Sequence, residues 1–313
     1  MSSFFSSLFF LLLIIQPYPM NLTQAEKNIF ILAGQSNMAG RGGVTNDTTT
    51  GATTWDGIVP SQCNPNPSIL KLNSHLKWVE AQEPLHEDID REKTNGIGPG
   101  MAFANHVLEK NMGVGVVGLV PCAIGGSNIS EWEKGKVLYS HMMKRVKASL
   151  RDGGGDVRGV LWFQGESDTV SLRDAESYQS RVRRFFLDVR ADLQTPLLPI
   201  IQVALASGSG PYVEIVRQAQ LGIDLLSLKT VDAKGLPLQP DGLHLSTQAQ
   251  VELGKMMGDA FLQFVPSSIP SPNVHHNNVS PIRKESSNSI GLSNFVSHIY
   301  IVPLFTTFLI MIS

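Results

Sequence analysis

The sequence predicts an α/β fold of three layers, in which helices cover both faces of a mainly parallel, five-stranded sheet. Two observations carry this prediction. Short apolar runs recur along the chain, and longer amphipathic patterns lie between them. The runs are apolar throughout, as strands buried on both faces of a parallel sheet should be, and they read NIFILA, VGVVGLV, VRGVLWF, LLPIIQVAL and LKTVDA.

The patterns between the runs predict helices. The segment PGMAFANHVLEKN begins with Pro99, a residue favoured at a helix start, and a glycine follows it closely. The segment from Arg173 to Leu193 has apolar residues on one helical face, namely Ala175, Tyr178, Val182, Phe185, Phe186, Val189 and Leu193. Strands and helices that alternate in this order make right-handed crossovers, and ligands bind such sheets outside the carboxyl ends of the strands.

The composition predicts one domain, from residue 28 to residue 264, without internal repeats. The chain has 313 residues, of which 42% are hydrophobic and 17% charged, enough to bury one sizeable core. Its net charge of −2 and the lack of a long basic run exclude a nucleic-acid partner, and we expect a monomer. Residues 42–98 have little regular pattern, and we interpret them as an excursion that walls the substrate side of the sheet.

Residues 1–22 are predicted to be a signal peptide. The apolar segment from Leu8 to Ile15 is too short to span a bilayer, and Pro17 and Pro19 follow it. No Lys or Arg precedes the segment, and a membrane anchor is the alternative interpretation. A secreted chain located outside the cell or in the cell wall is also consistent with four N-x-[ST] sequons, at Asn21, Asn46, Asn128 and Asn278.

The C-terminal residues have two parts. Residues 265–298 are rich in Ser, Pro and Asn and are predicted to be a disordered stalk. Residues 299–313 form an apolar tail, and small residues at 286–289 with a polar spacer give the layout of a glycosylphosphatidylinositol signal. Such a lipid anchor would be the only link to a membrane, at the outer plasma membrane, and a tail without an anchoring role is the alternative.

The chain has two cysteines, Cys63 and Cys122. In an oxidising compartment, two cysteines favour one disulfide, and we predict that they pair. Two buried free thiols are the alternative, because pairing depends on the distance between the two residues in the fold.

The first predicted strand ends in Gly34-Gln35-Ser36-Asn37-Met38. A serine on a sharp turn from strand to helix exposes its hydroxyl at the sheet edge, and its own N–H points toward an incoming oxygen. The pattern is not the G-x-S-x-G elbow, because Met38 takes the place of the last glycine. A serine that only caps a helix is the alternative interpretation.

The last predicted strand is followed by LQPDGLHLSTQAQVELG. Thr247 and Gln250 fit a T-x-x-Q capping box, so a helix should start there, with His244 just before it at the same sheet edge as Ser36. Asp241 precedes His244 by three residues. Its carboxylate could accept from the imidazole Nδ1–H and leave Nε2 facing outward, as a general base for serine requires. An Asp that caps a turn, beside a surface His, is the alternative.

Two further strand ends supply hydrogen-bond donors. The glycine pair Gly125-Gly126 offers backbone N–H groups with no side chain in the way, and Gln164 offers a carboxamide. Acyl transfer needs such donors around the oxyanion that develops. Turn glycines and a polar loop are the alternative, and Glu166 and Asp168 could bind a sugar hydroxyl or cap the next helix.

The motifs GQSNM, PCAIGGS, WFQGESD and DGLH occur in this order along the chain. Together they resemble the SGNH (GDSL-like) hydrolase superfamily, in particular the plant carbohydrate esterases of family six with the sialate O-acetylesterase-type domain. The resemblance covers residues 28–264 and implies a flavodoxin-like fold. It also implies a nucleophile at Ser36, a base and acid at His244, an orienting carboxylate at Asp241, and an oxyanion hole made by the Ser36 amide, a glycine of the 125–126 pair and Gln164.

The sequence therefore predicts a serine esterase that removes acetyl groups from cell-wall polysaccharide or oligosaccharide through an acyl-enzyme, without metal or cofactor. A second hypothesis is a metal-dependent hydrolase that uses Asp241, His244 and Glu166, although no spaced histidine pair accompanies them. A third is a non-catalytic carbohydrate-binding or surface protein on the same scaffold.

Overall fold

The computed structural model describes residues 26–47, 49–151 and 154–265 of the chain. The predicted signal peptide, the sequons at Asn21 and Asn278, the apolar tail and all but the first residue of the predicted stalk lie outside the described residues. These features remain predictions. Within the described residues, no helix is both long enough and apolar enough to cross a bilayer.

Among the described residues, seven strands form the central sheet, in the order β5-β4-β6-β1-β7-β8-β9. Every neighbouring pair is parallel except β4 with β5. The central strand is β1, in which Ile31 lies opposite Val120 of β6 and Val160 of β7. The strands are β1 Lys27–Gly34, β4 Ile69–Leu72, β5 Trp78–Glu80, β6 Val116–Pro121, β7 Gly155–Phe163, β8 Ile200–Ala204 and β9 Leu228–Asp232.

The α/β class is confirmed, and the five predicted runs are strands β1, β6, β7, β8 and β9. The prediction of a five-stranded sheet is wrong, because β4 and β5 extend the sheet beyond β6. These two strands read ILKL and WVE and lie within residues 42–98, where the sequence has little regular pattern. Strands of three or four residues are too short to display an alternation of polar and apolar residues, particularly at a sheet edge.

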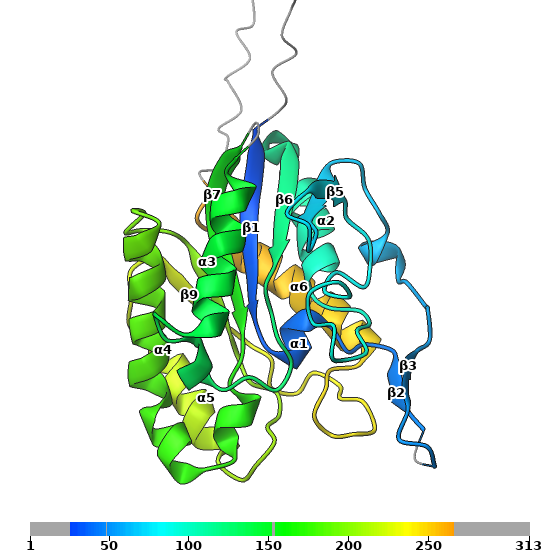
Figure 1. Ribbon diagram of the computed structural model, residues 1–313, viewed down its shortest axis with the longest axis vertical. Helices are drawn as coiled ribbons and strands as arrows, with labels where there is room; N and C mark the ends of the chain where they lie inside the picture. The colour runs from blue at the N-terminus through cyan, green and yellow to red at the C-terminus, as the bar shows by residue number, and fades with distance from the viewer. Residues whose placement is uncertain (1–25, 48, 152–153, 266–313) are drawn as a thin grey trace, which may run out of the picture. The chain divides into compact units, whose positions relative to one another are not determined.

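Helices cover both faces of the sheet (Figure 1). Helices α2 and α6 pack against each other on one face, and α3, α4 and α5 lie on the other. The helices are α1 Ser36–Ala39, α2 Gly100–Lys110, α3 Val137–Ser149, α4 Leu172–Asp192, α5 Val213–Leu221 and α6 Thr247–Leu262. In the described part of the chain, four short 3-10 helices connect other elements, namely η1 Ser61–Cys63, η2 Met112–Val114, η3 Ile129–Trp132 and η4 Glu166–Thr169.

Aromatic side chains fill the space between the sheet and the helices on both faces. Phe30 of β1 meets Phe103 of α2 edge to face, with ring centroids 4.9 Å apart. On the other face, Trp162 of β7 lies 5.3 Å from Trp132 and 4.5 Å from Phe185 of α4. All five rings are buried, and aromatic burial of this kind dominates core energetics. The strand ends are therefore held by a rigid core.

The prediction of α4 is confirmed, whereas the start of α6 differs from its prediction by one residue. Six of the seven residues predicted to share a face of α4 are buried, and Leu193 is partly buried just after the helix end. The cap of α6 is Ser246, whose hydroxyl accepts from the N–H of Ala249 at 3.3 Å, so the predicted cap at Thr247 is wrong by one residue. The side chain of Gln250 takes no part in a capping box and donates instead to the carbonyl of Asn37.

The long segment between β1 and α2 contains a hairpin as well as the two edge strands. Strands β2 (Val44–Asn46) and β3 (Thr53–Trp55) pair antiparallel. Figure 1 shows this hairpin reaching away from the sheet beyond α1, at the carboxyl end of β1. The excursion predicted for residues 42–98 is thus a hairpin followed by an extension of the sheet.

The predicted disulfide is wrong, because Cys63 and Cys122 are both free and buried. Cys63 lies against α2, where its thiol forms a hydrogen bond with the backbone of Ala102. Cys122 follows β6 beside Arg145 of α3, and burial raises the pKa of its thiol to about 11. Since α2 and α3 cover opposite faces of the sheet, the sheet separates the two sulfur atoms and no bond can join them.

Candidate active site

Strand β1 brings Ser36 to the carboxyl edge of the sheet through a turn that requires glycine. Gly34 has a φ of +133°, and a Cβ on it would lie 2.0 Å from the carbonyl oxygen of Phe163 in β7. Any other residue would therefore force β1 and β7 apart. Helix α1 follows at once, with Gln35 at its N-cap position and no side-chain cap. Ser36 is the first helical residue, so the interpretation of Ser36 as a helix cap is wrong.

The structure joins Ser36, His244 and Asp241 in one chain of hydrogen bonds. The hydroxyl oxygen of Ser36 lies 2.9 Å from Nε2 of His244. On the other side of the ring, Nδ1 lies 2.6 Å from Oδ2 of Asp241. The other carboxylate oxygen of Asp241 accepts the N–H groups of Leu243 and His244, both at 2.9 Å. The tight turn predicted between Asp241 and His244 is therefore present.

These bonds fix the charge on Asp241. Burial alone would raise the pKa of its carboxyl, but the N–H of His244, its imidazole and the N–H of Leu243 together lower the pKa below the ordinary value. An ionised carboxylate can only accept, so Nδ1 of His244 carries the proton. Nε2 is then left to accept the proton of the Ser36 hydroxyl.

Asn37 connects this turn to helix α1, a role that was not predicted from the sequence. Its Oδ1 accepts the N–H of Leu245 at 2.9 Å, and its Nδ2 donates to Oε1 of Glu166 at 2.7 Å. Gln250 of α6 donates to the carbonyl of Asn37 at 3.1 Å. Asn37 is fully buried. One side chain thus sets the distance between segments that lie about 200 residues apart in sequence.

Glu166 and Asp168 do not face a substrate, because they are 1% and 0% exposed. Glu166 accepts from Asn37, while Asp168 accepts from the N–H of Ile129 and from Gln164. Nor does either carboxyl cap α4, whose cap is Ser171. Both sequence interpretations, a sugar ligand and a helix cap, are wrong. Burial raises the pKa of each of these carboxyls to about 7.

The raised pKa of Glu166 predicts a pH-dependent stability. In the unfolded chain a glutamate titrates near pH 4.3, so the folded protein binds this proton more tightly. The contribution is full below about pH 4.3 and is lost as the pH rises toward 7, on the order of 3 kcal/mol in all. Glu166→Gln keeps the acceptor oxygen and abolishes the titration. Between pH 4.5 and 7.5, its free energy of unfolding should gain about 1–3 kcal/mol relative to wild type.

Urea unfolding at both pH values measures this difference. The matched control is Glu109→Gln, at an exposed position on α2, for which we expect no comparable change. A difference between Glu166→Gln and wild type that does not vary with pH would contradict the prediction.

The predicted oxyanion donors fall into two groups. The backbone N–H groups of Ser36, Gly125 and Gly126 donate no hydrogen bond to another described residue. Gly126 is exposed and has a φ of +79°, and a Cβ on it would meet nothing within 4 Å. These amides therefore have no acceptor in the described part of the chain and lie at the same sheet edge as Ser36.

Gln164 is placed differently from its prediction. It is 0% exposed, and its Nε2 lies within hydrogen-bond distance of three acceptors. These are Oε1 of Gln35 at 3.2 Å, the carbonyl of Ser127 at 2.9 Å and Oδ2 of Asp168 at 2.6 Å. Since a carboxamide has only two N–H bonds, Gln164 has no donor left for an oxyanion. The structure corrects this assignment.

Gln35 is the carboxamide that sequence reasoning missed. Its Oε1 accepts the N–H groups of Gly165 at 3.2 Å and Ser167 at 3.3 Å, as well as Nε2 of Gln164. Its own Nε2 has no hydrogen-bond partner in the described part of the chain. The side chain is thus oriented by its oxygen and keeps a free donor one residue before Ser36. The signal was in the motif GQSNM, where a carboxamide directly precedes the serine.

The residues of the metal hypothesis do not form a ligand cluster. Asp241 and His244 bind each other, whereas Glu166 is buried against Asn37. Across residues 26–47, 49–151 and 154–265, no group of three or more His, Cys, Asp or Glu side chains is arranged to hold a metal ion.

A cleft of about 960 Å³ opens beside the imidazole of His244. Its walls are the β2–β3 hairpin, residues 91–94 and residues 239–241, with Arg41 and His244 between them. The hydroxyl of Thr94 lies 2.6 Å from that of Thr53, so the loop and the hairpin are joined. Residues of the 42–98 excursion thus line the cleft beside His244, and its role as a wall of the substrate side stays a prediction.

Comparison with known proteins identifies the family of the chain. The profile of one family, described as "Carbohydrate esterase, sialic acid-specific acetylesterase", matches residues 26–263. A protein of Arabidopsis thaliana named "Probable carbohydrate esterase At4g34215" is 55% identical over 235 residues, which are 75% of this chain and 90% of that protein. Its X-ray structure covers 76% of this chain and 98% of its own, with a TM-score of 0.73 and 53% identity.

Two more distant structures share the fold. The crystal structure of NanS is 17% identical with a TM-score of 0.60, and covers 76% of this chain and 97% of NanS. That of XAC1771, a carbohydrate acetylesterase from Xanthomonas citri, is 18% identical with a TM-score of 0.55, and covers 75% of this chain and 56% of the other. With a family profile along three quarters of its length and a relative at 55% identity, the chain belongs to the carbohydrate esterase, sialic acid-specific acetylesterase family of carboxylic-ester hydrolases.

Proposed function

We propose that the protein removes O-acetyl groups from cell-wall polysaccharide or oligosaccharide, with Ser36 as nucleophile. The observation that carries this proposal is the hydrogen-bonded chain from Ser36 through His244 to Asp241 at the edge of a large cleft. The Ser36 hydroxyl attacks the acetyl carbonyl while Nε2 of His244 takes its proton. The imidazolium then gives this proton to the sugar oxygen as the ester bond breaks.

The second half of the reaction repeats the first with water. His244 removes a proton from the water that attacks the acetyl group on Ser36, and then returns it to the serine oxygen as acetate leaves. Asp241 stays ionised throughout and stabilises the imidazolium, which matches the lowered pKa of its carboxyl. Neither half requires a metal or a cofactor.

The oxyanion of each half-reaction needs donors close to Ser36. We assign this role to the N–H groups of Ser36 and of the Gly125-Gly126 pair, and to Nε2 of Gln35 in place of Gln164. The support is that all of these donors are free of partners in the described chain, whereas Gln164 is fully engaged. Aimed dipoles of this kind supply a large share of the rate of acyl transfer.

Gln35→Glu should lower kcat for acetyl esters by roughly 10²–10³, with little change in KM. The substitution keeps an oxygen for the N–H groups of Gly165 and Ser167 and replaces the free donor by an acceptor. Steady-state kinetics on p-nitrophenyl acetate give the numbers. Gln218→Glu, at an exposed position on α5, is the matched control. A loss confined to thermal stability, with kcat intact, would refute the assignment to Gln35.

We place the reaction outside the cell, at the wall or at the outer plasma membrane. The support comes from the predicted leader and C-terminal tail, and from the sequon at Asn46, which is exposed on the hairpin. Expression of the full chain in a plant cell, followed by phospholipase C, tests the tail. Release into the medium would support a lipid anchor, and retention on the membrane would refute it.

The substrate panel tests the proposal itself. Acetate release from acetylated xylan, pectin and mannan is measured with wild type and with Ser36→Ala. We expect wild type to release acetate from at least one of them and the variant to release none above background. Binding to these polymers without acetate release would instead support the non-catalytic carbohydrate-binding hypothesis.

A further inference from the structure

Three consecutive charged residues line the wall of the cleft. Arg91, Glu92 and Lys93 are exposed, and all three line the same cleft as Asp241 and His244. Within the described residues, none of the three side chains forms an ion pair or a hydrogen bond. Two cations and one anion therefore face the cleft without a partner in the described chain, and the carboxylate of Asp241, which is bound to His244, is a second anion in its lining.

A buried cluster holds the loop that carries them. The guanidinium of Arg41 is 7% exposed and lies 2.5 Å from Oδ2 of Asp90 and 2.9 Å from Oδ1 of Asn95. Nδ2 of Asn95 in turn donates to the carbonyls of Asp90, at 3.0 Å, and Lys93, at 2.9 Å. The loop thus closes around Arg41, whose charge Asp90 neutralises, and positions 91–93 are fixed relative to Ser36.

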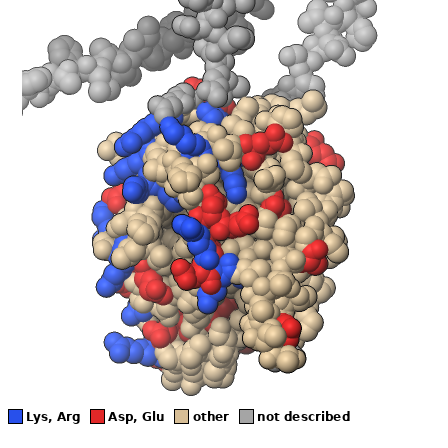
Figure 2. Space-filling view, turned by 45° about the vertical axis from the view of Figure 1, so that its right-hand side comes forward, with Lys and Arg blue, Asp and Glu red and all other residues tan. Residues whose placement is uncertain are grey.

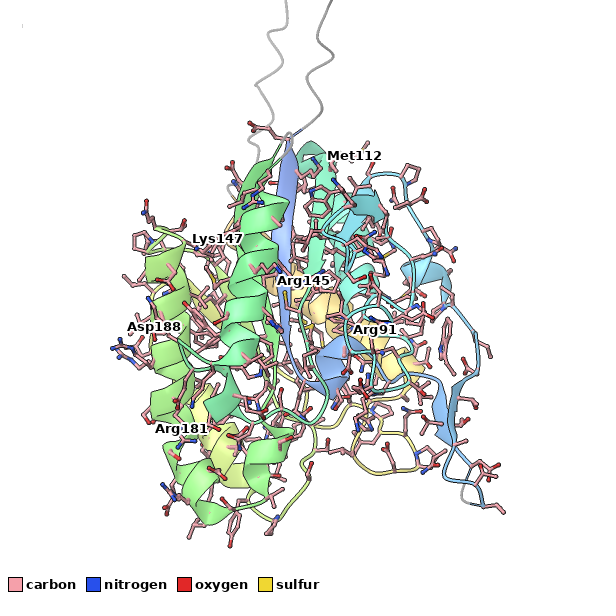
Figure 3. The ribbon with its side chains drawn as sticks, in the orientation of Figure 1. Arg91, Met112, Arg145, Lys147, Arg181 and Asp188 are labelled. Carbon is pink, nitrogen blue, oxygen red and sulfur yellow. The ribbon has the colours of Figure 1, made fainter. Side chains whose placement is uncertain are left out.

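The same cluster brings Lys93 next to the reacting group. A Cβ built on Gly125 would lie 3.6 Å from Cγ of Lys93. Gly125 belongs to the pair assigned to the oxyanion hole, so the side chain of Lys93 starts beside the proposed reaction site and lines the cleft there. Figure 3 labels Arg91 on the same loop, between β5 and α2, at the end of the sheet that carries α1.

The geometry points to a substrate that carries a carboxylate: an acetylated uronic acid, or an acetylated sugar joined to one. This inference rests on the proposed function and names its substrate class. Figure 2 shows basic side chains on the left half of the face, with acidic ones among them and beside them, and the net charge of the chain is −2. Selection of an acidic sugar must therefore come from local charges, and Arg91 and Lys93 supply them in the cleft. The negative charge of Glu92 opposes their attraction for a carboxylate, so its removal should have the opposite effect on an acidic substrate.

The test compares acidic and neutral acetylated substrates with single charge changes. Arg91→Gln and Lys93→Gln should each lower kcat/KM on acetylated oligogalacturonides about threefold through KM, and the double variant roughly tenfold. Glu92→Gln should raise it about threefold. Acetylated xylo-oligosaccharides without acidic branches, and p-nitrophenyl acetate, should change less than twofold. Raising the salt from 20 to 200 mM should weaken only the acidic reaction.

Arg183→Gln on α4 and Lys144→Gln on α3 are the matched controls, since both positions are exposed and unpaired in the described chain. Equal effects on acidic and neutral oligosaccharides, or none, would overturn the inference while acetate release still supports the esterase. Charge effects seen only with a free acetylated acidic monosaccharide would support it and identify a free sugar, not a polymer, as the source. If no substrate releases acetate in a Ser36-dependent way, the proposed function fails and this inference fails with it.

Discussion

Ser36→Ala is expected to lower kcat for acetyl-ester hydrolysis by roughly 10⁴–10⁶, and His244→Ala by a similar factor. The hydroxyl and Nε2 are 2.9 Å apart and act in one step, attack with proton transfer. Once either group is missing, the other has nothing left to contribute. The double variant should therefore be little worse than either single variant. Initial rates on p-nitrophenyl acetate, with each variant purified from contaminating esterase, provide the comparison.

The control is Ser140→Ala, at an exposed position on α3, which should keep wild-type activity. Labelling with a fluorophosphonate should modify wild type and not Ser36→Ala. Losses that add up in the double variant would mean that the two residues act separately. Such a result would remove the basis for the acyl-enzyme mechanism.

Asn37→Ala is expected to lower the free energy of unfolding by about 3–5 kcal/mol and to reduce kcat. The substitution leaves the carboxyl of Glu166 and the N–H of Leu245 buried without the partner that they now have. It also releases the turn of Asp241 and His244 from α1, so the imidazole loses its fixed distance to Ser36. Urea unfolding followed by tryptophan fluorescence measures the first effect, and steady-state kinetics the second.

A reciprocal exchange separates this explanation from a general packing defect. Asn37→Asp keeps the oxygen that accepts from Leu245 but, at a pH above 7 where Glu166 is ionised, sets two carboxylates against each other. Adding Glu166→Gln restores a donor opposite an acceptor, with the direction of the bond reversed. We expect the double variant to recover at least half of the stability that Asn37→Asp loses. Additive losses would show that the hydrogen bond is not what Asn37 contributes.

The sequence predicted the features that depend on local patterns, and those that depend on the carboxyl ends of parallel strands meeting at one edge of the sheet. The five predicted strands are apolar runs, and α4 is long enough to show its helical periodicity. Ser36 and His244 each follow a strand of the same sheet, so their approach could be expected from topology. The spacing of Asp241 and His244 is local, and it predicted the hydrogen bond at 2.6 Å.

The features that were missed depend on tertiary contacts. Gln35 and Gln164 are both buried carboxamides at strand ends, and nothing in either motif tells which one keeps an unpartnered Nε2. That difference depends on contacts between residues far apart in the chain, such as Gln164 with Ser127 and Gln35 with Gly165. The same reason applies to the cysteines. Their pairing was excluded by the sheet that lies between α2 and α3, which no spacing along the sequence reveals.

Arg41 has a consequence for how substrate preference can change over evolution or by design. Its side chain holds the loop of residues 90–95, and its carbonyl accepts from Nε2 of Gln239, at the start of the segment that carries Asp241 and His244. The framework of both cleft walls is thus specified by a few buried groups, whereas positions 91–93 contribute no side-chain bond to it. Substitutions at these three surface positions can therefore change the charge of the cleft, while the distances between Ser36, His244 and Asp241 stay the same.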